Sequence, residues 1–158
     1  MSELIHDLEE EHRVLGRLFG RVWTAGVTTH EVRHKLMGLR TALYAHCKRE
    51  EDALYPELRR AAVREENLRR LLADFAVEMT AVSDLAHTFF DRYAAFDRFN
   101  AAEDELDFAR DFGRVIAQFN YRIWSEEHVL FHEYAKLAAS TAEPANEFRR
   151  SVAASPTR

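Results

Sequence analysis

The sequence predicts an all-α protein, an antiparallel four-helix bundle with up-down-up-down topology. Helix-breaking residues are scarce, with 5 Gly and 3 Pro among 158 residues, whereas helix-forming Leu, Ala, Glu and Arg are frequent. Apolar residues recur at helical spacing along four long segments. The connections between these segments are short, which favours antiparallel neighbours.

The first two predicted helices cover residues 3–24 and 30–62. The first carries one regular inward-facing stripe, formed by Ile5, Leu8, His12, Leu15, Phe19 and Val22. Gly26 and a capping-box signal at residues 28–31 separate it from the second. Pro56 is expected to kink the second helix, because proline lacks a backbone donor and crowds the preceding turn. The inward stripe of this helix is predicted to comprise Leu36, Leu39, Leu43, His46, Glu50, Ala53 and Glu57.

The third and fourth predicted helices cover residues 65–96 and 104–138, with a polar break between them. The third presents Leu68, Leu72, Phe75, Met79, Val82, Ala86, Phe89 and Tyr93 on its inward stripe. The fourth presents Phe108, Phe112, Val115, Phe119, Arg122, Glu126 and Leu130. Residues 139–158 are rich in Ala, Ser, Pro and Arg and lack such a stripe. We therefore expect one bundle domain over residues 1–138 and a flexible tail over residues 139–158.

Composition excludes several functional classes. The net charge of −5 gives no electrostatic basis for binding nucleic acid or an anionic membrane. The N-terminus MSELIHDLEEEH is acidic, so we expect no signal peptide, and no window is apolar enough to span a bilayer. Cys47 is the one cysteine, which excludes an intramolecular disulfide and makes the cytoplasm the expected location.

Five polar residues occupy the middle of otherwise apolar stripes. A buried carboxylate must be paired or must coordinate a metal, because burial without a partner costs several kcal/mol. All five lie near the midpoints of their helices, and midpoints meet at one level in an antiparallel bundle. The sequence therefore predicts a polar layer halfway along the core, made of His12, His46, Glu50, Arg122 and Glu126.

Imidazole and carboxylate groups in this layer are suited to iron, zinc or manganese. His46 and Glu50 are four residues apart, so both can reach one ion from the same helical face. This spacing is common on helix surfaces, and the prediction depends on His12 and Glu126 falling at the same level. A hydrogen-bond network satisfied by protein groups alone is the alternative.

Three stretches of the sequence, LEEEHRVLGRLF, LYAHCKREEDALYPEL and FNYRIWSEEHVLFHEY, resemble the hemerythrin-like (HHE cation-binding) family. The resemblance covers most of residues 3–138. It implies a four-helix bundle with a non-haem di-iron centre, used for oxygen binding, oxygen or iron sensing, or related redox chemistry. It also implies that His12 and His46 are ligands and that Glu50 and Glu126 are bridging carboxylates.

Two positions depart from the family pattern. Met79 and Arg122 stand where the third and fourth helices of the family each supply a histidine, and both histidines serve the same iron. The half-site that remains predicts one iron ion rather than two, used to bind or sense dioxygen, peroxide or iron rather than for fast catalysis. The alternative is a metal-free bundle that acts as an interaction or regulatory module, with Arg122 paired to Glu50 and Glu126 and Met79 filling the remaining space.

Several other residues could contribute to a site. A two-iron oxidase that uses Glu78 as an extra ligand is the least favoured hypothesis, because Glu78 lies at the flank of its stripe. We expect solvated or flanking positions for Glu51, Glu127, His87, His128 and His132, and a small buried apolar role for Cys47. Tyr44, Tyr55 or Tyr121 are expected to donate hydrogen bonds to the carboxylates of the layer. The common nucleotide-binding, hydrolase and paired-cysteine redox motifs are absent from the sequence.

Overall fold

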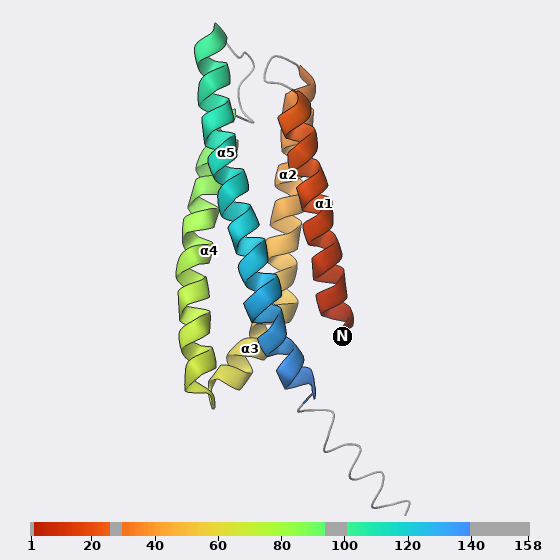
Figure 1. Cartoon of the computed structure of the whole chain (residues 1–158), viewed down its shortest axis with the longest axis vertical. Coiled ribbons are helices and arrows are strands. Elements are labelled where there is room, and N and C mark those ends of the chain that lie inside the picture. Colours follow the sequence, from red (N-terminus) through yellow and green to blue (C-terminus); the bar gives the residue numbers. More distant parts are fainter. Residues whose placement is uncertain (1, 26–29, 94–100, 140–158) are drawn as a thin grey trace, which may run out of the picture.

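The predicted fold class is confirmed. A computed structural model of the chain describes residues 2–25, 30–93 and 101–139, and these residues form an up-down-up-down helical bundle (Figure 1). Its long helices are α1 (Glu3–Ala25), α2 (His30–Arg49), α4 (Glu66–Tyr93) and α5 (Ala101–Ser125). The capping signal at residues 28–29, the last residues of the third predicted helix and residues 140–158 of the predicted tail lie outside the described residues.

The inward faces of α1 and α5 are those that the sequence predicts. In α1 the buried residues are Ile5, Leu8, His12, Leu15, Phe19 and Val22. The predicted stripe on α5 and beyond it, from Phe108 to Leu130, is also buried at every position. Both stripes therefore keep helical periodicity through their polar members.

Two π-helical turns interrupt the α-helical geometry at equivalent places. The first, η1 (Glu50–Leu54), follows α2, and the second, η2 (Glu126–Leu130), follows α5. In each turn a backbone N–H donates to the carbonyl five residues earlier, from Tyr55 to Glu50 and from Phe131 to Glu126. Each π-turn thus begins at the first glutamate of an E-E pair in the sequence. Single π-turns inside α-helices are frequent at functional sites.

The π-turn after α2 changes two details of the second predicted helix: where its geometry breaks and which residues face inward. The break comes at the π-turn, ahead of Pro56, which lies in the first turn of α3 (Tyr55–Ala62). The predicted inward positions Ala53 and Glu57 are wrong, since Ala53 is half-buried and Glu57 is exposed. A π-turn holds more residues than an α-turn, so it moves the inward face along the chain. Leu54, Tyr55 and Leu58 are the buried residues here, and α3 leads away from the line of α2 toward α4 (Figure 1).

A polar layer separates two apolar clusters of the core. One cluster lies on the side of Leu15, Leu43 and Phe119, and the other on the side of Leu8, Leu54 and Leu130. The five polar residues that the sequence predicts for this layer are all buried and lie between these positions along the chain: His12, His46, Glu50, Arg122 and Glu126. Ser125 is also buried here and was not predicted. None of the described helices is long and apolar enough to cross a membrane.

Candidate metal centre

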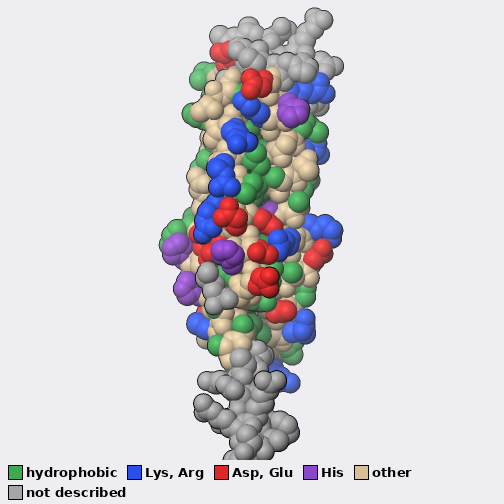
Figure 2. Space-filling view, turned by 90° about the vertical axis from the view of Figure 1, so that its right-hand side faces the viewer, with side chains coloured by type: hydrophobic (Ala, Val, Ile, Leu, Met, Phe, Trp, Pro, Cys, Tyr) green, Lys and Arg blue, Asp and Glu red, His purple; other side chains and the backbone are tan. Residues whose placement is uncertain are grey.

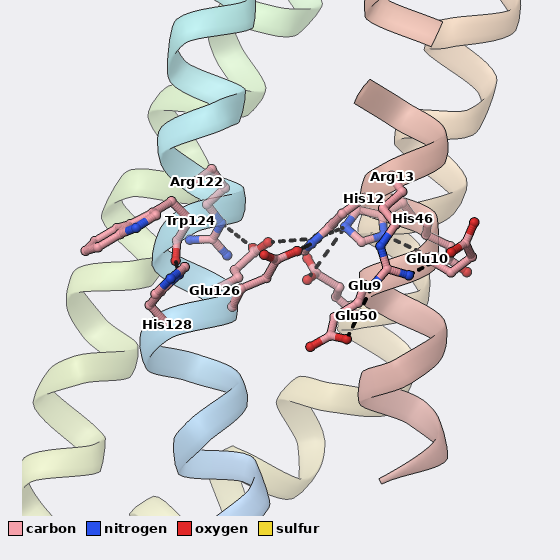
Figure 3. A network of polar contacts seen from close by, with 12 residues as sticks. Glu9, Glu10, His12, Arg13, His46, Glu50, Arg122, Trp124, Glu126 and His128 are labelled. Atoms are coloured by element: carbon pink, nitrogen blue, oxygen red, sulfur yellow. Dashed lines mark hydrogen bonds and ion pairs between the residues drawn. The ribbon is translucent and has the colours of Figure 1, made fainter. Parts of the chain in front are cut away.

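Four side chains in this layer converge on one point. His12 comes from α1, His46 from α2, Glu50 from η1 and Glu126 from η2, and each is at most 4% exposed. One potential ligand atom from each residue lies within 4.8 Å of the others. Figure 3 shows these side chains pointing toward one another across the bundle. The geometry brings together all four residues predicted from the sequence as metal ligands, in an arrangement that could hold an ion.

The two histidines are oriented by carboxylates on their outer sides. Nδ1 of His12 lies 2.8 Å from Oε1 of Glu127, and Nδ1 of His46 lies 2.8 Å from Oε2 of Glu11. An ionised carboxylate only accepts hydrogen bonds, so Nδ1 of each ring donates. Both Nε2 atoms therefore point inward, 3.1 Å apart. Metal-binding histidines have this arrangement, with the second nitrogen donating to a carboxylate.

The charges of the pair are unequal. Burial opposes protonation of His12, but its hydrogen bonds with Glu126 and Glu127 outweigh burial and raise its pKa. Burial lowers the pKa of His46, and the hydrogen bond with Glu11 offsets this only in part. The surroundings therefore favour a proton on His12 over one on His46, and Nε2 of His12 lies 3.1 Å from Nε2 of His46 and 3.3 Å from Oε2 of Glu126.

The two carboxylates of the layer also differ. Burial would raise the pKa of Glu126, but the hydrogen bond from His12 and the charge of Arg122 lower it. Burial and the negative charge of Glu126 together raise the pKa of Glu50 well above its ordinary value. Neither side-chain oxygen of Glu50 has a hydrogen-bond partner among the described residues. Such orphaned buried groups are rare in folded proteins and need an explanation.

Arg122 lies beside the four converging residues and fixes Glu126. Its Nε donates to Oε1 of Glu126, one terminal nitrogen donates to the Tyr55 hydroxyl, and the other donates to the Phe75 carbonyl at 3.3 Å. Its guanidinium also stacks over the Phe75 ring, 4.8 Å from the centroid. The predicted pairing with Glu126 is present. The predicted pairing with Glu50 is absent, because no Arg122–Glu50 ion pair forms among the described contacts.

Helix α4 supplies no ligand to this layer. Its residues between Phe75 and Ala86 are half-buried or exposed, Met79 included. The prediction that Met79 fills the space of a missing ligand is therefore wrong. Met79 instead lines a cavity of about 310 Å³ that also contacts His46, Glu50 and Glu126.

Comparison with protein families agrees with this geometry. The model of the hemerythrin HHE cation-binding domain matches residues 3–134. The chain belongs to the hemerythrin family. No curated protein and no solved structure gives a significant match. The hemerythrin HHE domain is described as cation-binding, and the buried His and Glu cluster of this hemerythrin-like chain could hold such a cation.

The residues of this hemerythrin-like layer fit a transition-metal ion. Two imidazole nitrogens and two carboxylates form a donor set typical of iron, manganese or zinc. An ion would also provide the missing partner for Glu50 and separate the two facing Nε2 atoms of the histidines. Both carboxylates lie at this level as the first residues of the two π-turns, each at the first glutamate of the repeated E-E phrase.

The remaining sequence candidates take the following places in the hemerythrin-like fold. Glu127 lies behind His12, whereas Glu51 is exposed and pairs with Arg59. His128 and His132 are exposed and bond backbone carbonyls through Nδ1. Burial raises the pKa of the Cys47 thiol to about 12, in agreement with its predicted apolar role. The predicted donation from a tyrosine to a carboxylate of the layer is not among the described contacts: the Tyr55 hydroxyl accepts from Arg122, Tyr44 bonds His87, and Tyr121 is exposed.

Sequence reasoning missed Glu11. It directly precedes His12 but reaches the other histidine, and a further ion pair joins it to Arg49 at 2.6 Å. Arg49 also pairs with Asp7. Figure 2 shows the side of the bundle on which α1 lies, and acidic and basic side chains gather there at about half the height of the bundle. The run EEEH holds a sequence signal for Glu11, since its third glutamate falls near the inward stripe.

Proposed function

We propose that this hemerythrin-like protein binds one non-haem iron ion through His12, His46, Glu50 and Glu126, and that it binds or senses dioxygen, peroxide or iron. Glu50 carries the proposal, because its carboxylate is 1% exposed and lacks a hydrogen-bond partner among the described residues. Among the described residues, the nearest basic group is Nε2 of His46, 3.7 Å from Oε1 of Glu50. A buried carboxylate with so distant a partner is costly unless a cation completes its surroundings. Iron, when bound, would supply redox chemistry and a place for dioxygen or peroxide.

The protein groups would hold the ion and limit its number. Glu11 and Glu127 keep the Nε2 atoms of the two histidines directed inward, and Arg122 keeps Glu126 ionised and in position. Arg122 places a fixed positive charge beside this site, where a second cation would be repelled. One ion is therefore favoured over two.

Metal analysis tests the proposal. Protein purified without a metal-binding tag, then loaded anaerobically with ferrous ion and desalted, should contain one equivalent of iron. Glu50→Gln should lose it, whereas the exposed control His128→Ala should retain it. Two equivalents in the wild-type protein would refute the single-ion site.

A metal-free regulatory or interaction module is the second candidate. It is favoured by the contacts of Arg122, which pair Glu126 and satisfy Tyr55 and the Phe75 carbonyl without any ion. It leaves Glu50 unexplained. Absence of iron, zinc and manganese after loading would establish this candidate instead.

A further inference from the structure

A cavity opens beside the proposed ion on the side away from α1. It is about 310 Å³ in volume, and three of the four proposed ligands, His46, Glu50 and Glu126, form part of its wall. His12 does not line it. The cavity exists because α4 buries no side chain between Phe75 and Ala86. Pockets of this size can enclose a small organic molecule.

Most of the cavity wall is apolar. Leu43, Cys47, Met79, Val82, Ala86 and Phe119 surround the space, with Ser83 as a small polar interruption. Among the lining residues, His87 on α4 is exposed and Tyr44 on α2 is half-buried, and they hydrogen-bond each other at 2.8 Å. The mouth of the cavity therefore lies between α2 and α4, and an occupant would have an apolar body.

The inner end of the cavity favours an anion. Arg122 lines it and has five N–H groups, three of which donate to protein acceptors. Two N–H groups remain without an acceptor among the described residues. Glu11 and Glu127 are partly exposed on the outer sides of the histidines and do not line the cavity. Among the buried groups that do line it, a divalent ion and Arg122 together would carry one more positive charge than Glu50 and Glu126 neutralise. A ligand with one negative charge would balance the buried layer.

We propose that this cavity binds a small monocarboxylate with an apolar body, such as a medium-chain fatty acid or an aromatic acid, with its carboxylate between the ion and Arg122. The inference rests on the proposed metal site, since four protein ligands leave further positions open on an ion that prefers higher coordination. The apolar body would lie against Met79 and Val82, and the Tyr44–His87 hydrogen bond would close the mouth behind it.

Cobalt(II)-loaded protein provides a direct spectroscopic test. Octanoate and benzoate distinguish an aliphatic from an aromatic body, and 1-octanol and benzyl alcohol are their uncharged analogues. We expect at least one acid to change the visible cobalt spectrum with saturation, and to bind about tenfold or more tightly than its alcohol, the effect of a charge-assisted hydrogen bond.

Variants of α4 locate the binding site. Ser83→Phe should fill the cavity and abolish the spectral change, and Val82→Phe should do the same from the neighbouring position if Ser83→Phe does not fold. Thr80→Phe adds the same ring at an exposed position of α4 and should leave the change intact. If cobalt binds but neither acid alters its spectrum, or if the cavity-filling variants respond like the wild type, the inference is wrong while the metal site stands. If cobalt does not bind, the proposed metal function fails, and the inference with it.

Discussion

His12 and His46 meet through their Nε2 atoms, 3.1 Å apart, although they come from different helices. Their rings meet at 66° with centroids 4.7 Å apart. Each Nδ1 donates outward to a carboxylate, so both Nε2 atoms face the layer, where Nε2 of His12 also lies 3.3 Å from Oε2 of Glu126. Two lone pairs at this distance repel unless a cation lies between them. A proton on His12, which the hydrogen bonds to Glu126 and Glu127 favour by raising its pKa, relieves this repulsion without metal, and a metal ion would relieve it for both rings and both carboxylates.

The outer carboxylates should tune the affinity for metal. Glu127→Gln and Glu11→Gln keep an oxygen that accepts from Nδ1 but remove the charge that makes the imidazole a stronger donor to metal. We expect each variant to bind ferrous ion about 10–100-fold more weakly. Anaerobic titration calorimetry measures this.

Glu10→Gln is the matched control for these variants. Glu10 is an exposed neighbour on α1 that pairs with Arg13 and Arg17, away from both histidines. Its substitution should leave iron affinity unchanged. Equal affinities in the Glu10, Glu11 and Glu127 variants would show that the outer carboxylates do not act on the metal.

Glu50→Gln, which should lose iron, should at the same time make the metal-free protein more stable at neutral and higher pH. The pKa of Glu50 is raised above its ordinary value of 4.5 in the folded metal-free protein, chiefly by burial, so the folded state holds this proton more tightly than the unfolded chain does. Its contribution to stability is therefore present at low pH and lost as pH rises from 4.5 toward the raised pKa. Glutamine cannot ionise and escapes this loss.

Urea unfolding of the metal-free proteins at pH 5 and pH 8 tests this prediction. At pH 8 we expect the free energy of unfolding to be higher for Glu50→Gln than for the wild type by about 1–3 kcal/mol, because a buried carboxyl that resists ionisation costs more at this pH than a neutral amide of the same shape. The difference should shrink at pH 5. Glu51→Gln, which changes an exposed carboxylate paired with Arg59, is the control. A wild type that is more stable than Glu50→Gln at pH 8 without metal would contradict the prediction.

The site was largely predictable because its residues follow the same periodicity as the core. His12, Arg122 and Glu126 interrupt regular apolar stripes, and a polar residue at an inward position must meet other polar residues. Which residues face inward after Glu50 was not predictable in the same way. An α-helical repeat places Glu57 inward, whereas the π-turn moves the face to Leu58, and hydrogen bonds five residues apart leave no clear pattern in one sequence.

Contacts between side chains of different helices could not be predicted from the sequence either. Periodicity places Glu11 beside the inward stripe but does not show that its carboxylate bonds His46 of the next helix. Nor does periodicity show that Met79 of α4 is only half-buried and lines a cavity. These features depend on how far apart the helices lie, which a stripe of residues does not encode.

Cys47 should be inert and should not bind the metal. Burial raises the pKa of its thiol to about 12, so about one thiol in ten thousand is ionised at pH 8. A thiol-reactive disulfide reagent should therefore label the folded protein far more slowly than the urea-unfolded protein. Cys47→Ala should retain its iron. Rapid labelling under native conditions, or loss of iron in the variant, would show that the thiolate is part of the site.

Restoring two histidines should create room for a second ion. Arg122 carries the positive charge that repels another cation, and Met79 lines the cavity next to it without offering a hard ligand. We expect Met79→His with Arg122→His to raise iron content from one equivalent toward two. The gain in metal should come at the cost of stability in the metal-free form, because Glu126 loses its ion pair and the Phe75 carbonyl loses a donor.

The two single variants separate the gain in iron content from the loss of stability. Arg122→His alone should destabilise the metal-free protein by about 3–5 kcal/mol, the cost of breaking a buried ion pair, with at most one iron bound. Met79→His alone should keep the Arg122 contacts and also hold one iron. Elemental analysis gives the stoichiometry, and urea unfolding after chelation gives the stability. If the folded double variant still holds one equivalent of iron, the charge of Arg122 is not what excludes the second ion. The half-buried position of residue 79 beside the cavity would then explain why a histidine there cannot complete a second site.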